Sequence, residues 1–124
     1  MKIKITFLAI IASVLFSCTE KISTEKEAAL LNLLEKEQLF ELRELYEANT
    51  DKISLQADLR IQASLLNTFN KNEESNKAID ELLNKFDEEL PDSIKTDLIF
   101  LKTDNYLKLF DYKKAFETNN IIIN

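Results

Sequence analysis

Apolar residues recur three and four positions apart along most of this chain, which is the spacing of one face of an α-helix. In the clearest stretch the apolar residues are Ala78, Ile79, Leu82, Leu83 and Phe86. The same spacing continues on both sides of this stretch. We therefore predict an all-α fold of six helices that start near residue 25, near Phe40, at Ser54, after Ser75, after Ser93 and at Asp111.

Turn and capping residues support these boundaries. Thr24 and Glu27 have the spacing of a capping box, and Ser54 suits the N-cap of a later helix. The remaining predicted breaks and turns are 35–38, 49–51, 71–75 and 90–93. The chain has no glycine and one proline, a composition that favours helix over sheet.

The helices also repeat along the chain. A shift of 37 residues aligns Ala78 with Ala115, and a shift of 35 aligns Leu30 with Leu65. A period in this range is typical of solenoids built from helical hairpins. In such a solenoid a small residue in the second helix of each pair lets the two backbones approach, and we assign Ala78 and Ala115 to that place.

The best copy of the repeat comprises Tyr106 and 110–117, the latter reading Phe-Asp-Tyr-Lys-Lys-Ala-Phe-Glu. It resembles the second half of a tetratricopeptide repeat (TPR), which typically runs Gly-Asp-Tyr-x-x-Ala-hydrophobic-Glu. Phe69 with 75–79 resembles a second copy, and 25–50 resembles a third. The resemblance implies a TPR-like array of about three antiparallel helical hairpins over residues 25–124, with a role in protein binding.

The chain departs from the TPR pattern at several positions. Phe110 and Glu73 stand in place of the turn glycine, and Thr103 and Leu66 replace the usual small residue of the first helix. The repeat period also exceeds the usual 34 residues. The resemblance therefore extends to a TPR-like arrangement and no further.

The concave face of TPR arrays often grips the terminal carboxylate of a partner. In this chain the corresponding positions hold Ala63, Asn67, Phe100 and Asp104. Only Asn67 suits a carboxylate, and Asp104 would repel one. We therefore predict that this carboxylate clamp is absent.

The N-terminus carries a separate pattern. Lys2 and Lys4 precede an apolar run, 5–16, which is followed by Ser17 and the only cysteine, Cys18. Twelve mostly apolar residues are too few to span about 30 Å of hydrocarbon, and they suit an export signal that is later removed. The segment resembles the signal peptide and lipobox of bacterial lipoproteins.

That resemblance implies that residues 1–17 are a signal peptide and that Cys18 is the lipid attachment site. Residues 18–24 would then be the lipidated cysteine and a polar spacer before the helical domain. Several acyl chains at Cys18 would hold the protein on a membrane of the bacterial cell envelope, with the outer membrane favoured over the inner one. The alternatives are a secreted protein with a leftover cysteine and an N-terminal membrane helix.

Composition excludes several kinds of chemistry. There is no histidine, and with one cysteine the chain can form no internal disulfide. Thiol and imidazole metal sites and histidine-activated nucleophiles are therefore excluded. Without glycine the chain cannot form Gly-rich phosphate loops. We predict no catalysis, no cofactor and no metal.

The chain is acidic, with 16 Lys and Arg against 22 Asp and Glu and a formal charge of −6. This charge argues against nucleic acid as a partner, because phosphates need a basic patch. Adjacent acids could in principle perform acid–base chemistry, but in a short acidic chain they are better explained as solvated helix faces. These acids are Glu25 and Glu27, Glu41 and Glu44, Glu73 and Glu74, and Asp87, Glu88 and Glu89.

Two further lipoprotein classes pair a lipobox with helical regions. Residues 71–76 and 104–120 resemble the helical N-terminal region of Bacteroidetes-type lipoproteins with a retropepsin-like aspartyl protease domain. The catalytic Asp-Thr/Ser-Gly segment is absent here, because the chain has no glycine. A SusD-like glycan-capture lipoprotein is disfavoured, since there is no tryptophan and the chain is too short for the binding loops.

The chain ends with Ile121, Ile122 and Ile123 before Asn124. A terminal solenoid helix normally has a polar outer face. We expect that another chain covers these isoleucines, by self-association or otherwise, or that the chain is a truncated module of a longer natural protein. The remaining alternative is that all three isoleucines pack under the fifth helix. The preferred function is a membrane-anchored scaffold that binds a protein partner, and the alternative is the helical module of the protease-like lipoprotein.

Overall fold

The computed structural model describes residues 22–123, and every regular element in that range is a helix. The predicted all-α fold is therefore confirmed. The predicted signal peptide and Cys18 lie outside the described residues. The described helices are α2 (Thr24–Glu35), α3 (Leu39–Glu47), the short 3₁₀-helix η1 (Thr50–Lys52), α4 (Leu55–Thr68), α5 (Asn72–Phe86), α6 (Asp92–Lys108) and α7 (Tyr112–Ile123).

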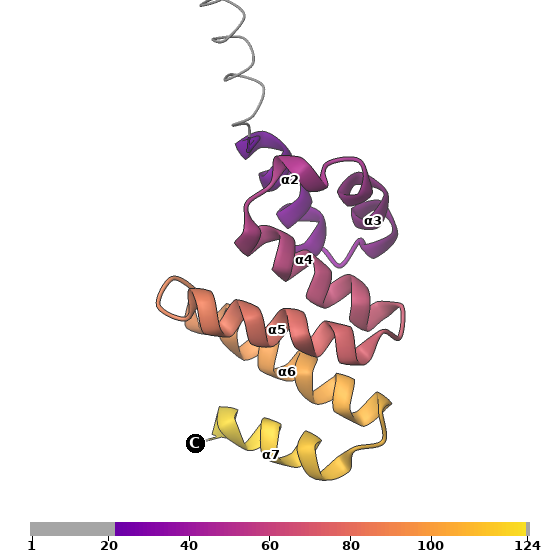
Figure 1. The fold of residues 1–124 in the computed structure, drawn as a ribbon, viewed down its shortest axis with the longest axis vertical. Coiled ribbons are helices and arrows are strands. Elements are labelled where there is room, and N and C mark those ends of the chain that lie inside the picture. The colour runs from indigo at the N-terminus through magenta and orange to yellow at the C-terminus, as the bar shows by residue number, and fades with distance from the viewer. Residues whose placement is uncertain (1–21, 124) are drawn as a thin grey trace, which may run out of the picture.

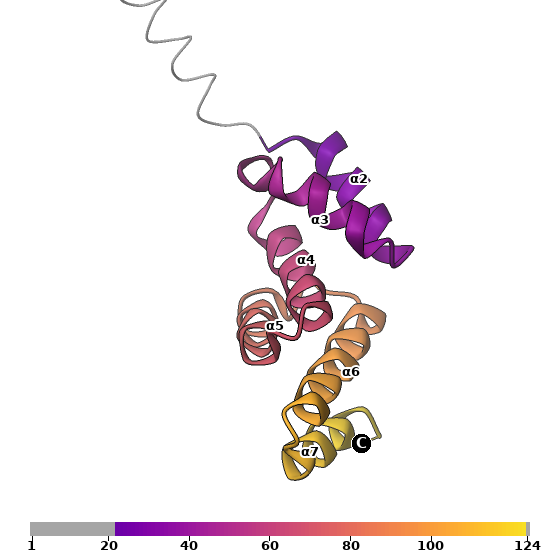
Figure 2. The same cartoon turned by 90° about the vertical axis from the view of Figure 1, so that its right-hand side faces the viewer.

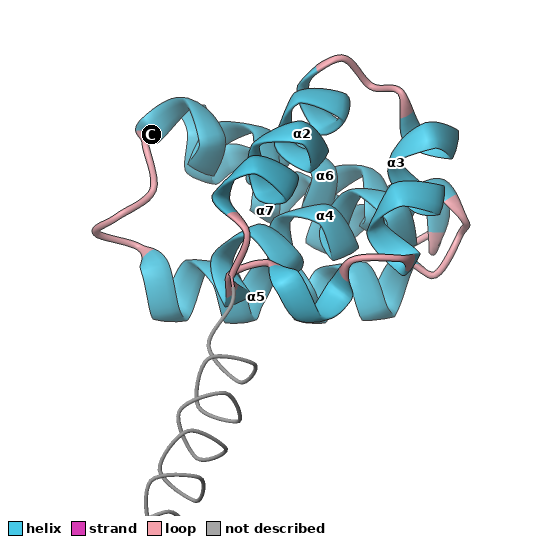
Figure 3. Ribbon diagram, turned by 90° about the horizontal axis from the view of Figure 1, so that it is seen from above, coloured by secondary structure: helices cyan, strands magenta, loops and turns pink. Residues whose placement is uncertain are grey.

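The helices follow one another along the long axis of the molecule (Figure 1). α2 and α3 lie at one end, α6 and α7 at the other, and α4 lies between the first pair and α5 (Figure 2). Each of α2, α4 and α6 contacts the helix that follows it, and α4 also contacts both α2 and α6. Seen along the long axis, the helices cross at varied angles instead of forming a parallel bundle (Figure 3). None of the helices described here is long and apolar enough to cross a membrane.

The three turns after α2, α4 and α6 share one backbone geometry. Glu37, Asn70 and Phe110 each have a positive φ of 55–60°. At each turn, the residue with positive φ and the residue after it donate their backbone N–H groups to carbonyls in the last turn of the preceding helix. The N–H of Asn70, for example, donates to the carbonyl of Asn67 at 3.1 Å. This is the Schellman motif, whose left-handed position usually holds glycine. A chain without glycine therefore accepts backbone strain at Glu37 and Phe110, while Asn70 tolerates the conformation better.

Two apolar clusters form the core, and α4 contributes to both. The cluster between α2, α3 and α4 contains the buried residues Leu30, Leu42, Ile53, Ala57, Ile61 and Leu65. The cluster between α4, α5 and α6 contains Leu59, Ala63, Ala78, Ile79, Leu82, Leu90 and Leu98. Alternate positions along α4 are buried because neighbours pack on opposite sides of it. α4 is therefore the central element of the fold.

Several predicted boundaries are confirmed. A break separates α2 from α3 within 35–38, and the predicted turn at 49–51 overlaps the 3₁₀-helix η1, which begins at Thr50. The hydroxyl of Ser54 accepts a hydrogen bond from the N–H of Ala57 at 3.2 Å, and the Asp111 carboxylate accepts one from the N–H of Lys114 at 3.2 Å. Ser54 therefore caps α4 as expected, and Asp111 caps α7 at the position where that helix was expected to begin.

Other boundaries were wrong. Ser23, not Thr24, is the N-cap of α2, because its hydroxyl accepts from the N–H of Lys26. Glu27 instead accepts a hydrogen bond from the N–H of Ser54 at 2.7 Å, which joins the start of α2 to the start of α4. The turn after α5 lies at 87–91, so Asp92 and Ser93 already belong to α6, and no side chain caps that helix.

The predicted turn at 71–75 was also wrong, because α5 begins at Asn72. The Schellman position Asn70 precedes α5 in the same way that Phe110 precedes α7. The structural equivalent of Ala115 is therefore Ser75, at a shift of 40 residues, and not Ala78 at a shift of 37. The first two turns, at 37 and 70, are separated by only 33 residues, because α3 is shorter than α5.

Candidate functional site

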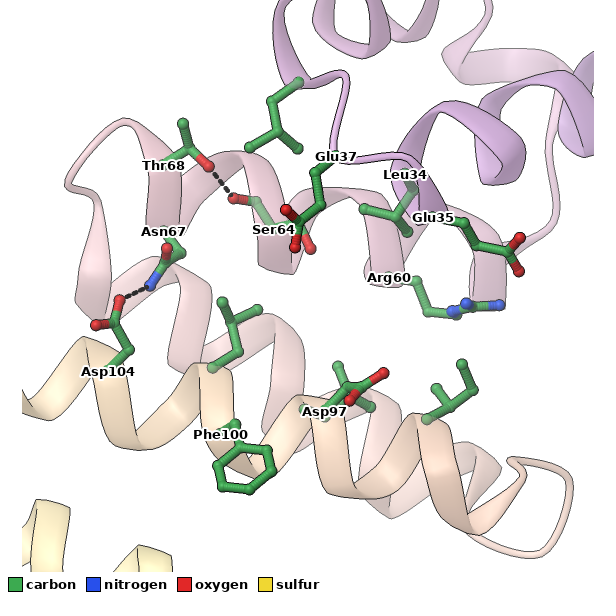
Figure 4. Close-up of a pocket in the computed structure, with 14 residues that line it drawn as sticks. Leu34, Glu35, Glu37, Arg60, Ser64, Asn67, Thr68, Asp97, Phe100 and Asp104 are labelled. Atoms are coloured by element: carbon green, nitrogen blue, oxygen red, sulfur yellow. Dashed lines mark hydrogen bonds between the residues drawn. The ribbon is translucent and has the colours of Figure 1, made fainter.

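A groove of about 780 Å³ lies in the described part of the chain. Helices α2, α4 and α6 line it, together with the turn after α2 and the first residue of α3 (Figure 4). Its lining residues are Leu34, Glu35, Glu37, Leu39, Arg60, Ser64, Asn67, Thr68, Ile94, Asp97, Leu98, Phe100, Leu101 and Asp104. The groove exists because α4 contacts both α2 and α6, so that these three helices form one wall.

The floor of the groove is apolar. Leu98 is buried and belongs to the cluster between α4, α5 and α6, while Ile94 and Leu101 are partly buried against that cluster. Phe100 differs from them, because it stays 52% exposed while lining the groove. An aromatic ring left open in this way can supply apolar contact area to a ligand.

The middle of the groove is charged. Arg60 extends from α4 between Glu35 of α2 and Asp97 of α6 (Figure 4). Burial lowers the pKa of the Arg60 guanidinium, and the charges of Glu35 and Asp97 act in the opposite direction. Among the ion pairs of residues 22–123, none joins Arg60 to either carboxylate. The guanidinium thus lies near two acids without a close ion pair to either.

At one end of the groove, Asp104 is held by its neighbours. The amide nitrogen of Asn67 donates to its carboxylate at 2.8 Å, and the ammonium of Lys108 lies 3.1 Å from the same carboxylate. The hydrogen bond from Asn67, followed by the hydrogen bond and charge of Lys108, lowers the pKa of Asp104 against the opposing effect of burial. Asp104 is therefore ionised, and the ammonium of Lys108 partly offsets its negative charge.

The structure places some, but not all, of the positions predicted for a carboxylate clamp in the groove. Asn67, Phe100 and Asp104 do line the groove, but Ala63 is fully buried in the core. The amide nitrogen of Asn67 already donates to Asp104 and to Asn105. Both N–H groups of the Asn67 side chain are therefore engaged within the protein, and the absence of the carboxylate clamp stays a prediction.

A buried polar network, which no sequence pattern predicted, lies behind this end of the groove. Asn105 is fully buried. Its amide nitrogen donates to the hydroxyl of Ser75 and the side-chain oxygen of Asn76, each at 2.8 Å, and its oxygen accepts from Asn67. Ser75 in turn donates to the carbonyl of Ala63 at 2.7 Å. The network joins α4, α5 and α6, so it fixes how the groove-lining helices are placed.

The acidic residues considered for acid–base or metal chemistry do not come together. Within residues 22–123, no group of three or more His, Cys, Asp or Glu side chains could hold a metal ion. Of these acids, Glu27 is tied to the backbone of Ser54 and Asp87 pairs with Lys95 at 3.1 Å. The others lie mostly on exposed helix faces, as their spacing indicated.

The C-terminal helix pair carries a second apolar surface. Its exposed residues are Leu107, Leu109, Phe110, Tyr112, Phe116 and Ile121. Ile121 is 65% exposed and Ile122 is partly buried, so the three isoleucines do not all pack under α6. Self-association through Ile121, Ile122 and Ile123 stays a prediction.

Comparison of this chain with known proteins finds no matching family model, no related curated protein and no similar solved structure.

Proposed function

We propose that this protein is a membrane-anchored lipoprotein whose TPR-like helical repeats bind a segment of another protein. The groove between α2, α4 and α6 is the binding surface in this proposal. The observation that carries it is the combination, in one concavity of about 780 Å³, of an apolar floor, an open aromatic ring at Phe100 and charged groups without close partners. Ligand sites commonly combine apolar lining with a few polar groups in this way.

The arrangement of the turns supports a repeat array. α2 with α3, α4 with α5, and α6 with α7 are consecutive helix pairs, and each pair is joined by the same Schellman turn. The first helices of the pairs also contact one another, from α2 to α4 and from α4 to α6. In a solenoid each unit contacts only its neighbours, and the stacked first helices form an extended surface for binding.

The anchor in this proposal is Cys18, through lipid attached after removal of residues 1–17. The described fold begins only a few residues later, with the N-cap of α2 at Ser23. The groove would therefore lie near the membrane of the bacterial envelope. A protein tethered in this way meets partners at the same surface at a raised effective concentration.

Site-specific photo-crosslinking in bacterial envelopes tests the binding role. A photoreactive phenylalanine analogue is placed at position 100 in the groove, and in a matched variant at position 88, which is exposed and outside the groove. We expect discrete protein adducts from position 100 that are absent from position 88 and that disappear when Leu101→Asp disrupts the floor beside it. Equal adducts from both positions, or none from position 100, would contradict the proposal.

A further inference from the structure

The geometry points to a specific ligand chemistry: the groove takes a protein segment that carries positive charges beside an apolar side chain. This inference rests on the proposed function, because it names the ligand of the same groove. It also goes beyond it, since a scaffold could bind neutral or acidic segments equally well.

The first argument is the charge balance of the groove. Four carboxylates line it, those of Glu35, Glu37, Asp97 and Asp104, against the single guanidinium of Arg60. Of these four carboxylates, only that of Asp104 takes part in an ion pair or a side-chain hydrogen bond with another described residue. The other three are solvent-exposed residues that line the groove. They remain open to a cationic ligand, each at the modest strength of a surface ion pair.

The second argument is the spacing of these acids. They come from the end of α2, the turn after it and the middle of α6, and they do not converge into a group that could hold a metal ion in residues 22–123. Arg60 lies between Glu35 and Asp97 and limits the repulsion between them. Charges distributed along a groove suit an extended segment with several basic residues better than a single small ion.

The third argument places the apolar part of the ligand. Phe100 follows Asp97 by three residues on α6, so both side chains lie on one face of the helix. An incoming apolar side chain can pack on the open ring while a neighbouring Lys or Arg approaches Asp97. An Arg or Lys can also stack on an exposed phenyl ring. The groove thus receives a charge and an apolar group next to each other.

The probes are three labelled peptides of about 12 residues, long enough to span the groove in extended form. One alternates Lys with Leu, one replaces Lys with Gln, and one replaces Lys with Glu. Anisotropy titrations use the full chain in detergent micelles, with protein-free micelles as a blank. We expect the basic peptide to bind most tightly, and binding to weaken when salt rises from about 0.05 M to about 0.5 M.

Two double variants locate the effect. Glu35→Gln with Asp97→Asn removes two groove charges, and Glu88→Gln with Glu89→Gln removes two exposed charges outside the groove. We expect the groove variant to weaken binding of the basic peptide about fivefold, the scale of two partly exposed ion pairs, and the control to leave it unchanged. Equal losses in both variants would overturn the inference, because they would indicate unspecific attraction to an acidic protein.

The outcomes separate this inference from the proposed function. If all three peptides bind alike and Phe100→Ser weakens each of them, the groove binds protein segments but does not select positive charge, and only the inference fails. If Phe100→Ser and the groove double variant leave the binding of every peptide unchanged, the groove is not the binding surface and both fail.

Discussion

Replacing Phe110 with glycine is expected to stabilise the fold, although it removes a large apolar side chain. Phe110 has a φ of 60° and is 78% exposed. A left-handed conformation costs a residue with a Cβ about 1–2 kcal/mol. Glycine avoids this cost but loses about 0.4–1 kcal/mol more backbone entropy on folding. The exposed ring contributes little burial, so the net gain is about 0.5–1 kcal/mol.

Thermal and urea unfolding followed by circular dichroism measure this gain. For a domain of this size the change corresponds to a rise in Tm of about 2–8 °C. Asn70→Gly should give a smaller gain, because asparagine tolerates the left-handed region. Lys113→Gly in the first turn of α7 is the matched control, and it should destabilise by up to about 1 kcal/mol. A Phe110→Gly protein that is less stable than the wild type would refute the assignment of strain to this turn.

Three further predictions test other parts of the structure. Asn105→Leu should lower the free energy of unfolding by about 2–4 kcal/mol in urea titrations, because it leaves the polar groups of Ser75, Asn76 and Asn67 without their partner. The control is Asn84→Leu on the exposed face of α5, which should change the free energy of unfolding by less than about 0.5 kcal/mol. Burial, with the hydrogen bond to Asp58 and the charge of its carboxylate, raises the pKa of Tyr46 from 10.0 to about 12. Since the pKa of Tyr46 is higher in the folded than in the unfolded state, its contribution to stability is complete below pH 10 and is lost as the pH rises through about 12. Absorbance titration should show one tyrosine that ionises near pH 12, and Tyr46→Phe should remove this step. A titration curve that the substitution leaves unchanged would contradict the prediction. Cys18→Ala should move the protein from the detergent-soluble membrane fraction to the soluble fraction, and unchanged partitioning would exclude the lipid anchor.

The helices could be predicted from the sequence because their buried faces follow the helical period. Helix α4 shows this, since Ser54 marks its start and Ile61 and Leu65 lie four residues apart on one side of it. The turn before α5 could not be located in this way. Asn72 and Ser75 are typical turn residues, but here they are buried in the first turns of a helix, and the actual turn at Asn70 lacks the glycine that usually marks a Schellman motif.

The candidate site was predictable only in part. Aligning the repeats placed Asn67, Phe100 and Asp104 on one face, and the structure puts all three in the groove. Arg60 and Glu35 were missed, because their proximity depends on how α2 packs on α4, which no local pattern encodes. The polar network was missed because a single asparagine in a helix, such as Asn105, normally indicates an exposed position.

The sharing of α4 between both apolar clusters has a consequence for how the protein unfolds. In a linear array each unit opens with a free energy set by its own stability and by its interfaces with its neighbours. α4 has interfaces on both sides, whereas α7 packs mainly on α6. Among residues 112–122 of α7, Ala115 is the only buried apolar residue. Amide hydrogen exchange should therefore be slower along α4 than along α7, with protection decreasing from the centre of the chain toward its last helix.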